Sequence, residues 1–370
     1  MRSPTSRPRP AARVAVLALA LVLAACAGSS GGSPAPSSVP TPDASDAPQT
    51  AEPSPQTSGS GALCPLNGLP IADRAVASRP PLLVQIDNDP VARPASNLTR
   101  ADIVIEAPVE LDMTRFSAIF LCQPTLGLTG PLRSARYYNI DLWQQLHLLT
   151  TYFGASNGAV ARFSAVGMPG VNGALPDWPW FQRVAGRIAP HNLYADIEAF
   201  RDSFGRMAAL DRLEGRAGAM RPPFVVAPTA RLHGGRPVSS VEIQTSSTWH
   251  FGWRWDASLG FWQRQDGGVP TTDVASGSSV TAATVVVQTI KEQAVPGDPD
   301  PGGNPRRLQL LVGSGAATLY ADGQAISLRW SRASASDTTH WTYMDGTPLV
   351  LRPGVIWWEI VPTTASVTEG

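Results

Sequence analysis

The first half of the chain contains short apolar runs separated by turn residues. Each run is rich in β-branched or aromatic side chains and stops at residues that favour turns, so each predicts a β-strand. The runs cover residues 82–86, 103–105, 116–121 and 148–153.

Two other segments show helical spacing. Apolar residues recur every three positions over 135–146, which predicts a helix there. Asn192 is a suitable N-cap for a second helix that continues through Arg201. Strands that alternate with helices predict an α+β N-terminal domain with a mixed sheet, which we place at 63–221.

The pattern changes at Pro222-Pro223, after which helical spacing almost disappears. Residues 251–265 alternate around a turn and predict a β-hairpin. Five further apolar runs predict strands over 284–290, 307–312, 317–320, 325–330 and 355–361. We therefore expect a mostly β C-terminal domain over 222–363 and a tail over 364–370. Within this domain, residues 296–305 are expected to form a mobile loop.

The chain begins with a pattern of another kind. Four arginines precede or open an apolar run over 14–23, and this run ends in Leu-Ala-Ala directly before Cys26. A basic segment, a short apolar run and small residues are typical of an export signal, and the run is too short to span about 30 Å of hydrocarbon. We predict a lipoprotein signal peptide over 1–25 and acylation, palmitate included, at Cys26.

Residues 26–62 are dominated by Ser, Pro, Gly, Ala and Thr and contain no aromatic residue. Such a segment buries too little apolar surface to offset its conformational entropy, so it predicts a disordered stalk. Together, signal and stalk predict an extracytoplasmic protein that a lipid anchors to the cell membrane.

The charge of the chain argues against a nucleic-acid partner. Formal net charge is zero, and loss of the four signal arginines lowers it to about −4. Lys291 is the only lysine, and the arginines are dispersed. A surface that follows a phosphate backbone needs clustered cations, which this sequence lacks.

Beyond Cys26, the chain has two cysteines, Cys64 and Cys122. Export into an oxidising compartment favours a disulfide between them. Two buried thiols remain the alternative, because the sequence does not give the separation of their Cα atoms.

Acidic, amide and guanidinium side chains gather at the predicted strand ends of the N-terminal domain. Such groups suit a carbohydrate or carboxylate ligand, since their fixed donors and acceptors orient hydroxyls and anions. The same groups can form an ion-pair network that only holds loops together, and Arg136 can pair with Asp141. Arg133 and Arg136 flank Ser134 at a helix start, which favours anion binding. The candidates are Asp87, Asn88, Arg93, Glu106, Glu110, Arg115, Arg133, Ser134 and Arg136.

Residues 154–158 match the nucleophile-elbow pattern G-x-S-x-G after an apolar run, which makes Ser156 a candidate nucleophile. Asp177 and His191 follow in the required order but too close together for the usual sheet, and His233 comes after the serine instead of before it. A glycine-rich turn is the alternative. The sequence therefore contains no complete catalytic set, and whether the protein is an enzyme stays open.

The five histidines are far apart, and zinc and calcium motifs are absent from the sequence. We therefore expect no metal and no cofactor. Eight of the eleven tryptophans lie between Trp249 and Trp358, and most of them are expected in the core. Trp357 and Trp358 are adjacent in a predicted strand, so they must face opposite sides of it.

In order along the chain, several motifs resemble the YerB-like bacterial lipoproteins, the DUF3048 family. The motifs are Cys64-Pro-Leu-Asn-Gly-Leu-Pro, Val84-Gln-Ile-Asp-Asn88, Ala92-Arg-Pro-Ala-Ser96, Ala101-Asp-Ile-Val-Ile-Glu106, Gly130-Pro-Leu-Arg-Ser-Ala-Arg136, Ala189-Pro-His-Asn-Leu-Tyr194, Phe261-Trp-Gln-Arg264 and Trp358-Glu-Ile-Val-Pro362. The resemblance implies a two-domain α+β envelope lipoprotein and adds His191 and Asn192 to the candidate ligand-binding residues. It brings no established activity. Pro270-Thr-Thr-Asp273 departs from the family's Pro-His-x-Asp segment.

From these observations we predict a membrane-anchored lipoprotein that binds a cell-wall glycan, an envelope protein or another surface ligand through the acid/arginine cluster. One alternative is a cell-envelope hydrolase or transferase that uses Ser156, or Glu106 with Glu110. A purely structural or assembly lipoprotein is the other alternative.

Overall fold

The computed structural model describes residues 61–79, 81–168, 170–174, 179–202 and 221–370. The predicted signal peptide, the lipidation site Cys26, nearly all of the stalk and Asp177 lie outside these residues. No helix within these ranges has the length and apolar character needed to cross a membrane.

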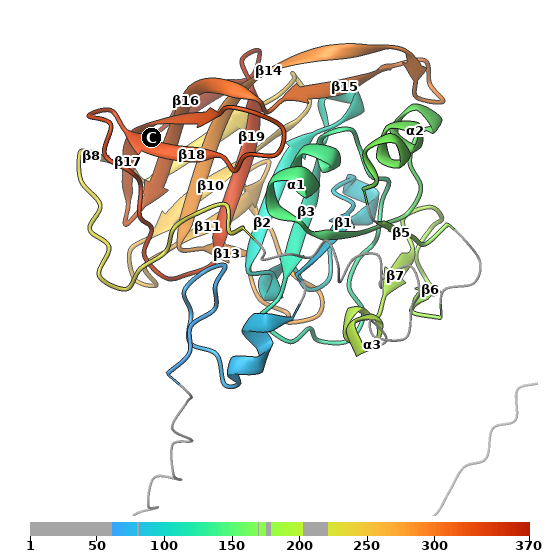
Figure 1. Ribbon diagram of the computed structural model, residues 1–370, viewed down its shortest axis with the longest axis horizontal. Coiled ribbons are helices and arrows are strands. Elements are labelled where there is room, and N and C mark those ends of the chain that lie inside the picture. The colour runs from blue at the N-terminus through green and yellow to red at the C-terminus, as the bar shows by residue number, and fades with distance from the viewer. Residues whose placement is uncertain (1–60, 80, 169, 175–178, 203–220) are drawn as a thin grey trace, which may run out of the picture. The chain divides into compact units, whose positions relative to one another are not determined.

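One large sheet contains strands from both halves of the described chain (Figure 1). Its strand order is β18-β17-β16-β14-β19-β2-β3-β1-β4-β5, and β15 pairs with β14 while β8 pairs with β17. The strands are β1 (Leu82–Ile86), β2 (Ile103–Pro108), β3 (Thr114–Phe120), β4 (Leu149–Tyr152), β5 (Gly170–Asn172), β8 (Gly235–Pro237), β14 (Thr284–Pro299), β15 (Pro305–Leu310), β16 (Gly313–Ala321), β17 (Gln324–Arg332), β18 (His340–Tyr343) and β19 (Ile356–Pro362).

Strand β19 joins the two halves of this sheet. It pairs in parallel with β2, with Ile356 opposite Ile103 and Glu359 opposite Glu106, and in parallel with β14 on its other side. Strand β3 pairs with β2 and β1 in antiparallel fashion, and β1 pairs with β4 in parallel. The segments that the sequence separates at Pro222 therefore share one sheet.

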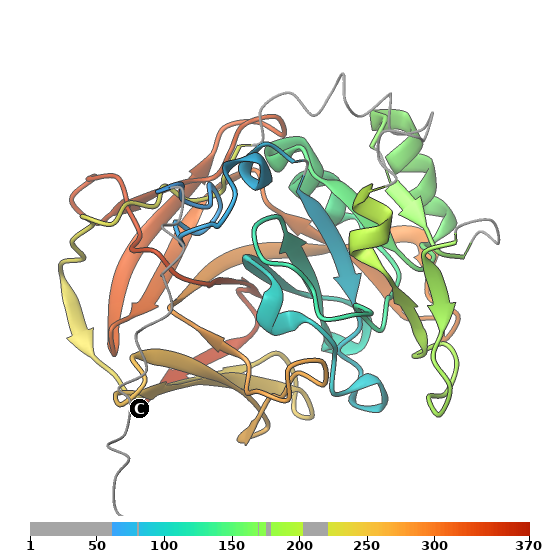
Figure 2. The same ribbon diagram turned by 90° about the horizontal axis from the view of Figure 1, so that it is seen from below.

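A smaller sheet has the order β12-β11-β10-β9-β20, with β13 paired to β11. Figure 2 shows its yellow and light-orange strands facing the large sheet. Buried Trp253 and Trp262 of the small sheet belong to one hydrophobic cluster with Val285 and Trp357 of the large sheet. The strands are β9 (Ser240–Gln244), β10 (His250–Asp256), β11 (Phe261–Asp266), β12 (Val269–Pro270), β13 (Thr281–Ala282) and β20 (Ser366–Glu369).

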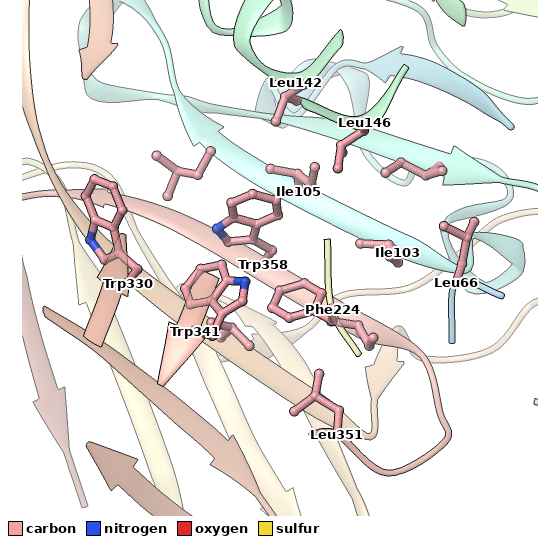
Figure 3. Packing of buried hydrophobic residues seen from close by; sticks show 14 of the residues in the cluster. Leu66, Ile103, Ile105, Leu142, Leu146, Phe224, Trp330, Trp341, Leu351 and Trp358 are labelled. Atoms are coloured by element: carbon pink, nitrogen blue, oxygen red, sulfur yellow. The ribbon is translucent and has the colours of Figure 1, made fainter. Parts of the chain in front are cut away.

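The opposite face of the large sheet has its own core, shown in Figure 3. Trp358 lies there with Phe224 and Trp341, whose rings stack with centroids 5.2 Å apart. Trp357 and Trp358 are both fully buried, one in each cluster. A strand buried on both faces explains why its apolar run is nearly continuous.

Helix α1 (Tyr138–Leu146) packs Leu142 and Leu146 into the Trp358 core. The helix expected from Asn192 is wrong at its start, because residues 193–195 form β7 and α3 begins only at Ile197. Pairing with β6 and the bond from Leu132 N–H to the Leu193 carbonyl outweigh the local helical pattern. The remaining elements are α2 (Asn157–Val166), α3 (Ile197–Asp202), β6 (Phe181–Arg183), β7 (Leu193–Ala195) and the 3-10 helices η1 (Arg74–Ser78), η2 (Pro90–Ala92), η3 (Leu98–Arg100) and η4 (Glu110–Asp112).

Two expected irregular segments are ordered in the structure. The expected loop over 296–305 is the tip of the β14–β15 hairpin, which Figure 1 shows reaching α2. At this tip the Asp298 carboxylate accepts hydrogen bonds from Tyr137 and Ser156. The expected tail over 364–370 contains β20, which pairs with β9. Hydrogen bonds to distant parts of the chain hold both segments in place more than burial of their side chains does. Their sequences therefore show no clear apolar pattern.

Cys64 and Cys122 form a disulfide with Cα atoms 5.9 Å apart. Asp102 lies beside it, and its carboxylate accepts hydrogen bonds from the backbone N–H groups of Leu121 and Cys122 and from Asn67 Nδ2. Burial raises the pKa of Asp102 to about 6 in spite of these bonds. The disulfide therefore fastens the start of the described chain to the end of β3.

Candidate functional site

Asp87 lies where β1 ends and the chain turns away from the sheet. Its N–H donates to the Pro131 carbonyl, which fixes the backbone, and its side chain is almost completely buried. Asp87 Oδ2 lies 2.7 Å from His191 Nδ1 and 3.2 Å from Arg133 Nε. Three candidates from distant parts of the sequence therefore meet at one carboxylate oxygen.

Asn88 connects the end of β1 to the next strand. Its Nδ2 donates to Thr114 Oγ1 over 2.8 Å and to Glu106 Oε1 over 3.3 Å. Its Oδ1 accepts from Arg93 Nε over 3.0 Å. One amide thus holds Arg93 in place and satisfies part of the Glu106 carboxylate.

Glu106 is paired with Arg264, a residue that the sequence reasoning missed. Arg264 Nη2 lies 2.8 Å from Glu106 Oε1, and Arg264 Nε lies 3.0 Å from Oε2. Both side chains are fully buried, and the guanidinium lies over the rings of Phe116 and Phe251. Neighbouring Asp266 and Glu106 hold the pKa of Arg264 above its usual value in spite of burial. In the predicted hairpin, Arg264 shares a strand face with Trp262, and this inward position was the available signal.

Glu359 lies opposite Glu106 on the adjoining strand β19. Its side chain is fully buried; Oε1 accepts from Trp253 Nε1, while Oε2 has no hydrogen-bond partner among the residues that the structure describes. Burial and the charge of Glu106 raise the pKa of Glu359 well above its usual range. Two carboxyl groups on neighbouring strands therefore lie close together in the core, and Arg264 pairs with that of Glu106.

A cleft of about 380 Å³ opens beside these groups. Asp87, Asn88 and Arg93 line it from the N-terminal side, and Asp266 and Thr271 line it from the β11–β12 hairpin. The two sides are linked, since Arg93 Nη1 lies 3.2 Å from Asp266 Oδ1. The rest of the lining is mainly apolar and includes Pro90, Pro94, Leu98, Phe116, Val269 and Pro270.

Glu110 belongs to a second ion-pair cluster. Arg136 Nη2 lies 2.6 Å from Glu110 Oε2, and Arg306 Nη1 lies 2.7 Å from Oε1. Asp141, the alternative partner of Arg136, pairs with Arg332 instead. Neither Glu106 nor Glu110 lines the cleft, and each is held in an arginine pair of its own.

The remaining candidates lie at the edges of these clusters. Arg115 donates from Nη1 to the Ser134 carbonyl over 2.9 Å. Asn192 accepts from Arg183 Nη1 over 2.6 Å and donates to the Arg187 carbonyl. Arg115 and Ser134 are therefore in contact with each other. The side chain of Asn192 bonds to Arg183 and Arg187, which lie close to it in the sequence.

Ser156, the serine of the elbow-like pattern, is the N-cap of helix α2. Its Oγ accepts from the Ala159 N–H and donates to Asp298 Oδ2 over 2.5 Å. The bond from the Ala159 N–H is that of a helix N-cap. In the described part of the chain, the one group of metal-ligand type is Cys64, Asp102 and Cys122, and its sulfur atoms are consumed by the disulfide.

Comparisons with known proteins agree with this architecture. Residues 66–209 match the N-terminal domain, and residues 241–358 the C-terminal domain, of a protein family of unknown function, DUF3048. The chain is 28% identical over 309 residues to "Putative lipoprotein YerB" of Bacillus subtilis, which covers 83% of this chain and 88% of the relative. The crystal structure of the B. subtilis YerB protein matches with a TM-score of 0.70 and 27% identity, over 83% of this chain and 99% of that one. The chain thus belongs to the DUF3048 family and has a YerB-like fold.

Proposed function

We propose that this protein is a lipid-anchored extracytoplasmic protein whose cleft binds a polar ligand of the cell wall or cell surface. The signal pattern before Cys26 and the lipoprotein name of the B. subtilis relative support the anchor. A flexible stalk of about 36 residues that is rich in Ser, Pro and Gly would have a root-mean-square reach on the order of 35 Å. That distance is enough to hold the cleft away from the bilayer and within reach of the wall.

The main support for this proposal is the cleft that Arg93 and Asp266 line. Its polar wall offers a carboxylate at Asp87, an amide at Asn88 and a guanidinium at Arg93, which together can orient hydroxyl and amide groups. Its apolar wall of prolines and Val269 suits the flat face of a sugar ring. A cleft of this volume with few fixed polar groups is the usual form of a small-ligand site.

An enzymatic function has weaker support. Ser156 caps a helix, and the carboxylates of Glu106 and Glu110 are each occupied by arginines. A glycoside hydrolase needs two carboxyl groups on either side of one bond. Labelling of Ser156 by a fluorophosphonate probe would revive the serine version.

The binding proposal is tested with insoluble peptidoglycan and with N-acetylglucosamine tetramer. Co-sedimentation and calorimetric titration of the purified protein should show binding to both. Arg93→Ala should weaken binding at least tenfold, because it removes the group that joins the two walls of the cleft. Arg254→Ala is the matched control, since Arg254 is an exposed arginine of β10. Equal binding by Arg93→Ala, or no binding by the unaltered protein, would show the proposal to be wrong.

The anchor is tested separately at Cys26. In cells fed labelled palmitate, the unaltered protein should carry label and sediment with membranes. Cys26→Ala should carry no label and leave the membrane fraction. Label that persists in the variant would contradict lipidation at this cysteine.

A further inference from the structure

Arg115 is a buried cation that has no counterion. Its side chain is only 6% exposed, yet it forms no ion pair with any carboxylate in the part of the chain that the structure describes. Of its five N–H donors, one forms a hydrogen bond, from Nη1 to the Ser134 carbonyl. Burial of an ionised group without a partner is unfavourable, so such a group needs an explanation.

The nearby carboxylates are already in contact with other side chains. Asp87 contacts Arg133 and His191, and Glu110 contacts Arg136 and Arg306. Both acids act on the charge of Arg115, but only at longer range than an ion pair. The cluster around Arg115 therefore contains more guanidinium groups than carboxylates.

Arg264 provides an internal comparison. It is as deeply buried as Arg115, but Glu106 and Asp266 contact it directly and hold its pKa above the usual arginine value. For Arg115, burial and the neighbouring charge of Arg136 lower the pKa to about 9. Two arginines at similar depth thus differ in one respect, the presence of a partner anion.

Arg133, whose charge acts on Arg115, is more exposed to solvent than Arg115. The Arg133 side chain is 22% exposed and the His191 side chain 14%. The backbone of Arg133 is fixed on both sides, because its N–H donates to the Gln85 carbonyl and its own carbonyl accepts from the Phe153 N–H. The backbone that carries this second guanidinium is therefore fixed, and Asp87 contacts its Nε over 3.2 Å.

We propose that Arg115 and Arg133 bind an oxyanion, a carboxylate or phosphate group carried by the ligand. Charge-assisted hydrogen bonds from two guanidinium groups are a common way to bind both kinds of group. The inference rests on the proposed function in one respect, since it assigns the acidic part of the same ligand. Asp87 makes the link, because it lines the cleft and also contacts Arg133.

The test is thermal unfolding of the purified protein in sodium phosphate or sodium acetate against sodium chloride at equal ionic strength. An oxyanion at about ten times its dissociation constant should raise the Tm by about 3 °C. Arg115→Met should abolish this rise and have an equal or higher Tm in chloride, because it removes an uncompensated buried charge. Arg329→Met, an exposed arginine of β17, should keep the rise.

Three results would overturn the inference: no oxyanion-specific rise in the unaltered protein, an equal rise in Arg115→Met, or a large loss of Tm in that variant in chloride. The last result would mean that Arg115 is a structural cation. Sodium lactate and glycerol phosphate repeat the measurement with the acidic groups of peptidoglycan and of phosphate polymers, and the larger response identifies the source. Because N-acetylglucosamine tetramer is neutral, its binding tests the cleft alone, so the two proposals can fail separately.

Discussion

Replacement of Arg264 by methionine tests whether the buried ion pair holds the two sheets together. Arg264 comes from the small sheet and Glu106 from the large one, and both side chains are fully buried. Methionine keeps most of the length of arginine and removes the charge. In this variant, Glu106 keeps only the hydrogen bonds that Thr114 and Asn88 donate to it. A second acid, Glu359, lies opposite it on the neighbouring strand.

The expected loss follows from the cost of one unpaired charge. Removal of one partner from a buried pair typically costs about 3–5 kcal/mol of unfolding free energy. Arg264→Met should therefore be among the most damaging single substitutions in the protein. The double variant Glu106→Gln with Arg264→Met leaves no charge at this pair and should recover most of the loss, because Asp266, the other acid that contacts Arg264, keeps its contact with Arg93.

Urea unfolding at pH 7, followed by tryptophan fluorescence, measures these free energies. Arg329→Met is the matched control and should change stability by less than about 0.5 kcal/mol, because its side chain is exposed. A loss below about 1 kcal/mol in Arg264→Met would refute the reasoning. So would a double variant that is no more stable than the single one, since the penalty would then lie in packing and not in charge.

Three further predictions concern buried groups. Cys64→Ser with Cys122→Ser should lower the unfolding free energy in urea by about 4 kcal/mol, because the disulfide closes a loop of 58 residues; no loss would contradict this. Glu359→Gln should raise the unfolding free energy, by an amount that is near zero at pH 4 and grows towards pH 8. The reason is that a carboxyl whose pKa is raised in the folded state loses stability as pH rises above its pKa in the unfolded state. A gain in unfolding free energy that is constant with pH would count against this prediction. The pKa of Asp102 is raised in the same direction, so the unfolding free energy of the unaltered protein should fall as pH rises from about 4 to about 6. Asp102→Asn should remove that fall when unfolding in urea is measured across this pH range. An unchanged pH profile in the variant would show that Asp102 is not its cause.

Local patterns predicted the local elements of the fold well. The run Leu82–Ile86 forms β1 with the expected bounds, and the hairpin predicted over 251–265 is β10 and β11. Alternation also placed Trp357 and Trp358 on opposite faces. These features depend on side-chain periodicity within a few residues, which the sequence displays directly.

Long-range pairing was not predictable in the same way. Arg264 lies 158 residues from Glu106, and neither sequence neighbourhood indicates which acid a buried arginine meets. Asp298 lies in the segment predicted as a mobile loop, yet its carboxylate accepts hydrogen bonds from Tyr137 and Ser156. Alternation in a predicted strand can indicate that a charged residue faces inward, but its partner is set by the topology of the whole sheet.

The position of β19 has a consequence for how the chain folds. β19 is synthesised after both of its neighbours, β2 and β14, yet it lies between them. Until it is available, both strands have an open edge that can pair with other chains. Folding of the large sheet must therefore wait for nearly the whole chain, with many contacts distant in sequence and a slow rate. An N-terminal fragment that ends near Arg221 should aggregate during expression, and studies of the cleft need the complete folded region.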